Sequence, residues 1–139
     1  MPPAPTIVYQ LEPNLSADEF IAVLVSSTLG ERRPIDDGSR IEGMLRQADL
    51  IVTARCDGKL VGVSRALTDF QFCTYLSDLA VDEAVQGQGI GKRLIEETHL
   101  AAGKHTMLIL IAAPKAASYY PHIGMEAHPS CWVIPRKAE

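Results

Sequence analysis

The sequence, 139 residues long, has no stretch that looks like a membrane segment. Its apolar runs all fall short of the roughly 20 residues that a spanning helix needs, and its start, MPPAPTIV, lacks the charged and apolar regions of a signal peptide. Cysteine is also scarce, because only Cys56, Cys73 and Cys131 are present, scattered and odd in number. Such usage favours a reduced compartment over a disulfide framework. We therefore expect a soluble cytoplasmic protein.

A surplus of basic residues is missing too. The chain has 13 lysines and arginines against 17 acidic residues, which gives a net charge of −4. Without a global basic surface, it is poorly suited to nucleic acid as its principal partner. Internal repeats, low-complexity segments and a domain boundary are also absent. With 47% hydrophobic residues it can bury a core, so we expect one domain over residues 6–139 behind a flexible, proline-rich tail at residues 1–5.

Apolar periodicity and turn signals predict a mixture of strands and helices. Ser16 and Glu19 form a capping box at the start of the first helix, and Gly30 stops it. Asp57-Gly58 is the strongest hairpin signal in the chain, and the charged segment 31–38 should be a loop. The predicted strands are 6–11, 50–56, 59–68, 75–81, 106–113 and 128–134, and the predicted helices are 16–29, 39–48, 90–102 and 115–120.

The segment from Thr106 to Ala113 is a nearly continuous apolar run, which is typical of a central strand buried on both faces. One helix connects it to the strand that contains Tyr75, so these two strands should pair in parallel. The strands before them form an antiparallel meander. The sequence therefore predicts a mixed α/β (α+β) fold, with a mostly antiparallel sheet and a parallel strand pair at its centre.

The chain is organised around residues 74–104, where a strand passes through a polar turn into three alternating glycines and a helix. Gly87, Gly89 and Gly91 let an anion approach the backbone, and a helix starting there points its unpaired N–H groups and positive dipole end at that anion. Lys92 and Arg93 add positive charge. The turn is thus a candidate phosphate cradle, although an ordinary strand-to-helix turn can have the same glycines.

Spacing decides between phosphate ligands. A dinucleotide fingerprint needs G-x-G-x-x-G near the start of a βαβ unit, whereas this run is G-x-G-x-G and lies past the middle of the chain. A Walker A loop needs glycine where Gln86 stands and a serine or threonine where Arg93 stands, so the hydroxyl that holds magnesium is missing. The spacing therefore supports neither a dinucleotide fold nor an NTPase.

A different signature does match. Residues 86–91 (QGQGIG), which follow LAVD at 79–82, closely resemble the acetyl-CoA signature Q/R-x-x-G-x-G/A of the GNAT superfamily of N-acetyltransferases. Residues 116–125 (AASYYPHIGM) are similar to that family's A-x-x-F-Y-x-x-x-G-F segment. Both motifs occur in the right order, and the first 50 residues match only in coarse pattern. The resemblance implies a GNAT-like domain whose parallel strand pair splays around acetyl-CoA, with helices on both faces of the sheet.

The resemblance also implies roles for residues. Leu79, Ala80 and Val81 would lie in the strand whose bulge aims a backbone N–H at the thioester carbonyl and whose edge pairs with the pantetheine arm. Tyr120 would protonate the departing thiolate, which suits a side chain with an ordinary pKa near 10, and Tyr119 would pack. The residues implied to hold the pyrophosphate are Gln86, Gly87, Gln88, Gly89, Ile90, Gly91 and Lys92.

The sequence departs from the family pattern at two positions. Tyr75 stands where many members have the glutamate that receives the amine's proton. Asp78 is the nearest acidic substitute, with water or the amine's own equilibrium as alternatives. Ala113 stands where many members have an asparagine that contacts the cofactor arm, so we expect that contact to be lost.

We therefore expect an acetyl-CoA-dependent N-acetyltransferase that acts by direct transfer to a primary amine, on a small molecule or a peptide. A non-catalytic acyl-CoA-binding or sensing module is the alternative. No metal is expected, because His122, His128 and Cys131 lack a fourth ligand at zinc-like spacing. Neither nucleic acid nor a membrane is an expected partner, and a homodimer is compatible with the resemblance.

Overall fold

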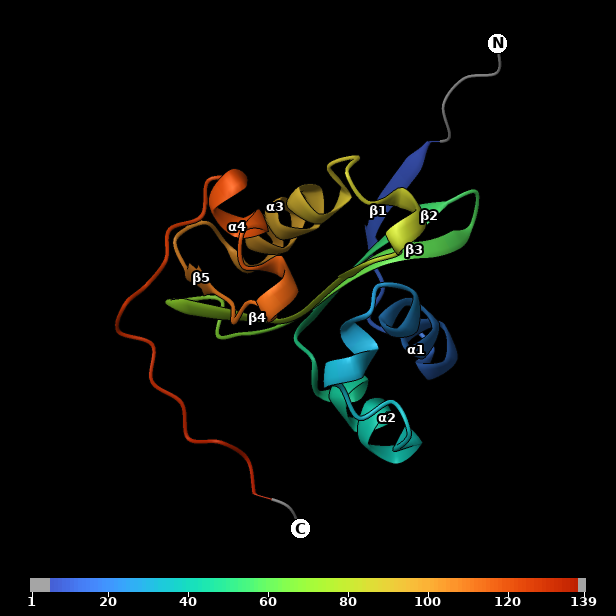
Figure 1. Cartoon of the computed structure of the whole chain (residues 1–139), viewed down its shortest axis with the longest axis horizontal. Coiled ribbons are helices and arrows are strands. Elements are labelled where there is room, and N and C mark those ends of the chain that lie inside the picture. Colours follow the sequence, from blue (N-terminus) through green and yellow to red (C-terminus); the bar gives the residue numbers. More distant parts are fainter. Residues whose placement is uncertain (1–5, 138–139) are drawn as a thin grey trace.

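The computed structural model describes residues 6–137 apart from the Lys115 side chain, so the predicted tail at residues 1–5 lies outside the described residues. Its strands form one sheet in chain order, with helices on both faces (Figure 1). The strands are β1 (Ile7–Leu11), β2 (Leu50–Cys56), β3 (Lys59–Thr68), β4 (Cys73–Val81) and β5 (Met107–Ile109). The α-helices are α1 (Ala17–Ser26), α2 (Gly38–Gln47), α3 (Ile90–Ala102) and α4 (Tyr119–His122). The short 3₁₀ helices are η1 (Leu29–Arg32), η2 (Glu83–Val85) and η3 (Pro114–Ala116).

The sheet is mixed, which confirms the predicted fold class. Strands β1 to β4 pair antiparallel, and β4 pairs with β5 in parallel. The β2–β3 hairpin turns at Asp57 and Gly58, whose φ angles of 51° and 83° are the left-handed values that such a two-residue turn requires. The hairpin signal and the parallel crossover were thus both correct.

Two predictions about the C-terminal half are wrong. β5 is a short strand at the edge of the sheet with Met107 and Ile109 exposed, rather than a central strand buried on both faces. The predicted strand at 128–134 has no regular structure, so no described strand extends the sheet beyond β5. The strand that is buried on both faces is instead β3, the middle strand, because it has a neighbouring strand on each side and helices above and below.

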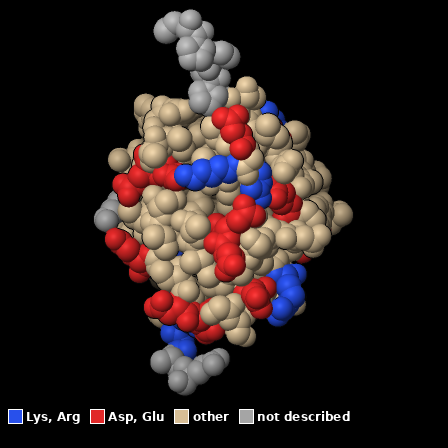
Figure 2. All heavy atoms as spheres, turned by 90° about the vertical axis from the view of Figure 1, so that its right-hand side faces the viewer, with Lys and Arg blue, Asp and Glu red and all other residues tan. Residues whose placement is uncertain are grey.

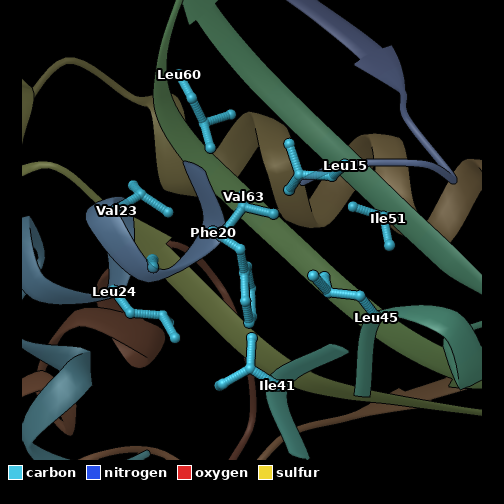
Figure 3. Packing of buried hydrophobic residues seen from close by; sticks show 10 residues of the cluster. Leu15, Phe20, Val23, Leu24, Ile41, Leu45, Ile51, Leu60 and Val63 are labelled. Carbon is cyan, nitrogen blue, oxygen red and sulfur yellow. The ribbon is translucent and has the colours of Figure 1, made fainter. Parts of the chain in front are cut away.

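Helices α1 and α2 cover one face of the sheet (Figure 1). Ser16 caps α1, since its hydroxyl accepts a hydrogen bond from the Glu19 backbone N–H at 3.2 Å. Phe20 of α1 is fully buried and packs between Val63 of β3 and Ile41 of α2 (Figure 3). Burying one such side chain contributes about 1.5–3 kcal/mol, so this contact fixes both helices against the sheet.

Helix α3 covers the other face. Ile90 and Leu94, four residues apart on its inner side, are buried against β2 and β3. The strand residues in this cluster are Val52, Ala54 and Val61. The 3.6-residue period thus seats α3 on the sheet, and its first turn follows directly from the glycine turn that comes after β4.

After β5 the chain forms η3, α4 and then an extended segment. α4 lies slightly later than the predicted helix 115–120, and Pro121 stands in its first turn, where a missing N–H is tolerated. Within the described residues, no helix or strand follows α4. Trp132 and Ile134 are 91% and 95% exposed, and Figure 1 shows this segment running away from the sheet.

Charged side chains of both signs are interspersed on the face shown in Figure 2. A polyanion would need a continuous row of lysines and arginines, which this face does not present. Among residues 6–137, no helix combines the length and the apolar character needed to cross a bilayer.

Candidate active site

Strands β4 and β5 separate along the sheet and leave an opening. Their pairing ends where Tyr75 lies opposite Ile109, and no described strand pairs with residues 76–81 on that side. A pocket of about 920 Å³ lies here, which is near the upper end of the usual range for ligand pockets, so it can hold a large ligand. Its walls come from residues 27–33 after α1, from β4, from the glycine turn with the start of α3, and from residues 110–123.

The β4 wall of the pocket contains a β-bulge. Arg65 of β3 pairs with Asp78 and the next residue, Ala66, pairs with Leu76, which leaves Ser77 without a partner in β3. An extra residue of this kind bends a strand and re-aims the backbone groups beside it. The pocket therefore has a bent strand with an unpaired edge on one side.

The strand residues predicted to contact the cofactor point in alternate directions. Leu79 and Val81 line the pocket, whereas the Ala80 side chain is 2% exposed and belongs to the core beneath α1. This alternation follows from the two-residue period of a strand. Ala80 can therefore offer the pocket its backbone only.

The glycine turn leads from β4 into α3. Gly87 and Gly89 have φ angles of 82° and 79°, and a Cβ at either position would meet no described atom within 4 Å. Gly89 is the N-cap of α3, and no described side chain caps the helix. Ile90 and Gly91, the first residues of the helix, therefore have N–H groups without a partner inside the helix, and such groups can bind an anion.

The other residues of the turn contribute unequally. Gln86 lines the pocket, and its Nε2 donates a hydrogen bond to the Val81 carbonyl at 3.0 Å, which ties the turn to the end of β4. Gln88 does not line the pocket. Of the two predicted cradle residues with amide side chains, Gln86 therefore supports the turn and Gln88 is not part of the pocket lining.

The two basic residues that follow the turn also differ. Lys92 lines the pocket. Arg93 instead pairs with Glu97 at 2.8 Å and lies over the Tyr9 ring, 4.8 Å from its centroid. The positive charge beside the turn is therefore that of Lys92. Arg93, which was also expected to add charge there, instead contacts Tyr9 and so joins α3 to β1.

Two tyrosines of α4 line the same pocket. Their rings meet edge to face with centroids 5.3 Å apart. Burial, assisted by the neighbouring Tyr119, raises the pKa of Tyr120 above its ordinary value of 10. Tyr120 is therefore protonated at neutral pH and can donate a proton into the pocket.

Tyr119 reaches the start of α3 with its hydroxyl, although the sequence predicts a packing role. A Cβ built on Gly91 would lie 2.6 Å from the Tyr119 hydroxyl oxygen, so a larger residue here would displace the tyrosine. Burial raises the pKa of Tyr119, and a hydrogen bond from the Lys92 backbone N–H partly offsets that rise. The Tyr119 hydroxyl therefore lies beside the first turn of α3, close to the Lys92 backbone N–H.

Asp78, predicted as a substitute base, is fully buried and does not line the pocket. One of its carboxylate oxygens accepts a hydrogen bond from Arg33 Nε and the other from Arg65 Nε. Taking a proton from an amine would break one of these two ion pairs. The geometry therefore argues against Asp78 as the proton acceptor.

Arg33 and Arg65 are residues of this region that sequence reasoning missed. Arg33 lies in the charged segment 31–38, whose composition predicts only a loop. Arg65 is 7% exposed in the middle of the apolar strand β3. A lone arginine inside an apolar strand needs a buried acidic partner, so its position was a signal that could have pointed to Asp78.

The two departures from the family motif lie in different surroundings. Ala113 lines the pocket, whereas Tyr75 does not. Among the described residues, no three histidine, cysteine, aspartate or glutamate side chains are placed together to hold a metal ion. The pocket offers its backbone groups, Lys92 and the tyrosines, and the titratable side chains Glu31, Glu83 and His122 line it as well.

Comparison with known proteins matches this arrangement to a family. The family model of the acetyltransferase (GNAT) domain matches residues 47–126, which is more than half of the chain. GCN5-related N-acetyltransferase 2, chloroplastic, from Arabidopsis thaliana is 36% identical over 73 residues, which cover 51% of this chain and 28% of that protein. The chain therefore spans less than a third of the length of this relative.

Solved structures share the fold along nearly the whole chain. A probable acetyltransferase of unknown function from meticillin-resistant Staphylococcus aureus has a TM-score of 0.77 at 20% identity, covering 96% of this chain and 100% of that one. Aminoglycoside N-acetyltransferase AAC(6')-Iy, solved in complex with CoA, has a TM-score of 0.74 at 16% identity, covering 99% of both chains. The splayed strands, the glycine turn and the match to the family model lead to one conclusion: this chain belongs to the GNAT acetyltransferase family.

Proposed function

We propose that this chain transfers an acetyl group from acetyl-CoA directly to a primary amine, as an N-acetyltransferase. One observation carries the proposal: the glycine turn, the unpaired edge of β4 and Tyr120 line a single pocket. Such a pocket offers an anion site for phosphates, a strand edge for an arm that contains amides, and a proton donor. These are the groups that a CoA thioester needs.

The residues of the pocket suit acetyl-CoA. The N–H groups of Ile90 and Gly91 would bind the pyrophosphate in the open space before Gly87 and Gly89, with Lys92 adding positive charge. The backbone of residues 79–81, on the unpaired side of β4, would pair with the pantetheine amides and donate an N–H to the thioester carbonyl. Acetyl-CoA would supply the acetyl group as an activated thioester, and CoA would be the leaving group, as a thiolate.

Tyr120 is the proposed general acid. Its raised pKa keeps the hydroxyl protonated at neutral pH, so it can give its proton to the leaving thiolate. The amine must lose a proton as well, and Asp78 is occupied by two arginines. We propose that this proton passes to water in the pocket, so no side chain needs to act as the base.

An assay of free thiol released from acetyl-CoA tests the proposal. The panel should contain a small amine, an aminoglycoside, amino-acid amines, and peptides with a free N-terminus or a lysine. Turnover with any of them supports the transferase. CoA binding without turnover on any amine would favour a sensing module instead, and the absence of both would overturn the cofactor site. The cytoplasmic location and the homodimer stay predictions.

A further inference from the structure

We propose that Arg33 is a positioning residue for acetyl transfer, because it fixes the β4 bulge from the loop that follows α1. The inference rests on the proposed function for its chemical consequence. Its structural part concerns only how the bulge at Ser77 is held. It gives the buried Arg33–Asp78–Arg65 cluster a role that the reaction steps above leave open.

Arg33 binds β4 with two of its three guanidinium nitrogens. Nε binds one oxygen of Asp78, and Nη2 donates to the backbone carbonyl of Ser77 at 2.7 Å. Nη1 donates to the carbonyl of Arg32 at 2.9 Å, which anchors the group to its own loop. The side chain is 21% exposed, and its two bonds to β4 are partly shielded from water.

Arg65 holds the same two residues from β3. Its Nε binds the other oxygen of Asp78, and its Nη2 donates to Ser77 Oγ at 3.0 Å. The bulge residue is therefore held through its carbonyl by one arginine and through its side chain by the other. Asp78 supplies the negative charge that lets two guanidinium groups lie side by side, one of them buried.

The hydrogen bond from Arg33 Nη2 orients the Ser77 carbonyl, which the bulge leaves without a partner in β3. Ser77 has no partner in β3, so the ladder does not orient its carbonyl. Residues 79–81, whose N–H groups are proposed to meet the thioester, begin two positions further along β4. A rotation at the bulge would move those N–H groups, and a misplacement of about 1 Å can lower a rate by about 100-fold.

The same contact joins two walls of the pocket. Arg32 and Arg33 itself line the side built by the loop after α1, and Ser77 lines the side built by β4. Because one guanidinium binds both segments, the loop and the strand edge keep a fixed relation. In this proposal Arg33 acts on the reaction through Ser77, and its side chain also lines the pocket.

Amide hydrogen exchange on the cofactor-free protein tests the structural part. In Arg33→Gln, the amides of residues 77–81 should exchange about tenfold faster or more, while β2 and β3 keep the rates of the parent. Arg33→Lys keeps the charge but has no fork to reach Asp78 and Ser77 together, so it should not restore protection. Arg32→Gln removes an equal charge from the neighbouring position and should leave exchange at residues 77–81 unchanged.

Kinetics test the chemical part. Arg33→Gln should lower kcat by about 10- to 100-fold, with the KM for the amine and the Kd for CoA changed less than about threefold, because the glycine turn is untouched. Parental exchange rates in Arg33→Gln, or full recovery in Arg33→Lys, would overturn the proposal. So would a loss confined to the KM for the amine, which would make Arg33 a substrate contact. If the parent transfers no acetyl group to any amine, the proposed function fails, and the exchange comparison still decides how the bulge is held.

Discussion

Adjacent tyrosines in α4 occupy different surroundings although they share one pocket. Neighbouring helical residues point about 100° apart, and here the Tyr119 hydroxyl lies against Gly91 at the start of α3. The Tyr120 ring packs edge to face against the Tyr119 ring, and the two ring centroids are 5.3 Å apart. Removing the hydroxyl of Tyr120 should therefore affect the chemical step, whereas removing the hydroxyl of Tyr119 should affect the affinity for the cofactor.

Tyr120→Phe keeps the ring and its packing but removes the proton donor. If Tyr120 protonates the thiolate, kcat should fall by roughly 10²- to 10⁴-fold with little change in CoA affinity. Steady-state rates with an amine whose chemical step is rate-limiting measure the effect. Tyr9→Phe is the matched control, because Tyr9 lies on β1 beneath Arg93 and away from the pocket. Equal losses in the two variants would remove Tyr120 from the mechanism.

Tyr119→Phe should strengthen CoA binding. Its hydroxyl lies beside the first turn of α3 and close to the Lys92 backbone N–H, so a phosphate group would compete with it for that N–H. Losing one such hydrogen bond corresponds to about 0.5–1.5 kcal/mol, which is a decrease in Kd of about 2- to 13-fold. Calorimetric titration measures this change. Weaker binding in the variant would mean that the hydroxyl helps to hold the cofactor.

At the scale of elements, the start of α3 depends on glycines with left-handed φ angles. Gly89→Val places a side chain in the open space before the helix and should weaken CoA binding at least tenfold, about 1.4 kcal/mol, by blocking the pyrophosphate. Gly58→Val is a matched control for backbone strain, since Gly58 has a φ angle of 83° and nothing within 4 Å of its Cβ position, in the β2–β3 hairpin. Both variants should lose similar stability in thermal unfolding. Only Gly89→Val should lose CoA in a titration, and parallel CoA affinities would reject the cradle.

Elements with local signals were predicted well from the sequence. The cap at Ser16 and the apolar period of α3 identify helices because both depend on residues within a few positions of each other. The burial of residues 106–113 is different, because it depends on which strands and helices become neighbours, and the segment expected at 128–134 forms no strand. An apolar run alone therefore predicted a central strand where the chain has an exposed edge.

The candidate site, like the fold, was predictable where a local motif marks it and not where it depends on contacts between distant residues. The motif located the glycine turn and Tyr120, which line the pocket as expected, although their roles stay predictions. The contact of Arg33 with Asp78 joins residues 45 positions apart, and no periodicity encodes such a pair. The bulge at Ser77 depends on strand register, which apolar patterning does not resolve to a single residue. Long-range polar contacts were thus the part that the sequence could not supply.

For the whole molecule, one ionic cluster should set the behaviour in acid. Arg55 of β2 binds Glu12, which follows β1, at 2.8 Å and Glu19 of α1 at 2.7 Å. Hydrogen bonds from Arg55 hold the pKa of Glu12 at about 2, below its ordinary 4.5, and also lower the pKa of Glu19. A lowered carboxyl pKa stabilises the fold above pH 4.5, and that contribution is lost as the pH falls from about 4.5 towards 2.

Glu12→Gln should therefore destabilise the fold at neutral pH by about 1–2 kcal/mol and converge with the parent near pH 2. Unfolding followed by circular dichroism across this pH range measures the difference. Glu42→Gln, at an exposed position of α2, is the control and should follow the parent throughout. A constant difference between Glu12→Gln and the parent at every pH would show that packing, and not ionisation, is responsible.

The extended segment after α4 also gives the molecule an optical probe. Trp132 is the only tryptophan of the chain, and 91% of its surface is exposed. Its fluorescence is therefore that of an indole in water even while the protein is folded. Its fluorescence should therefore change little when the domain unfolds, and a melting curve recorded by this signal would miss the transition. A blue shift of the emission with rising protein concentration would instead report that a second chain has covered the segment.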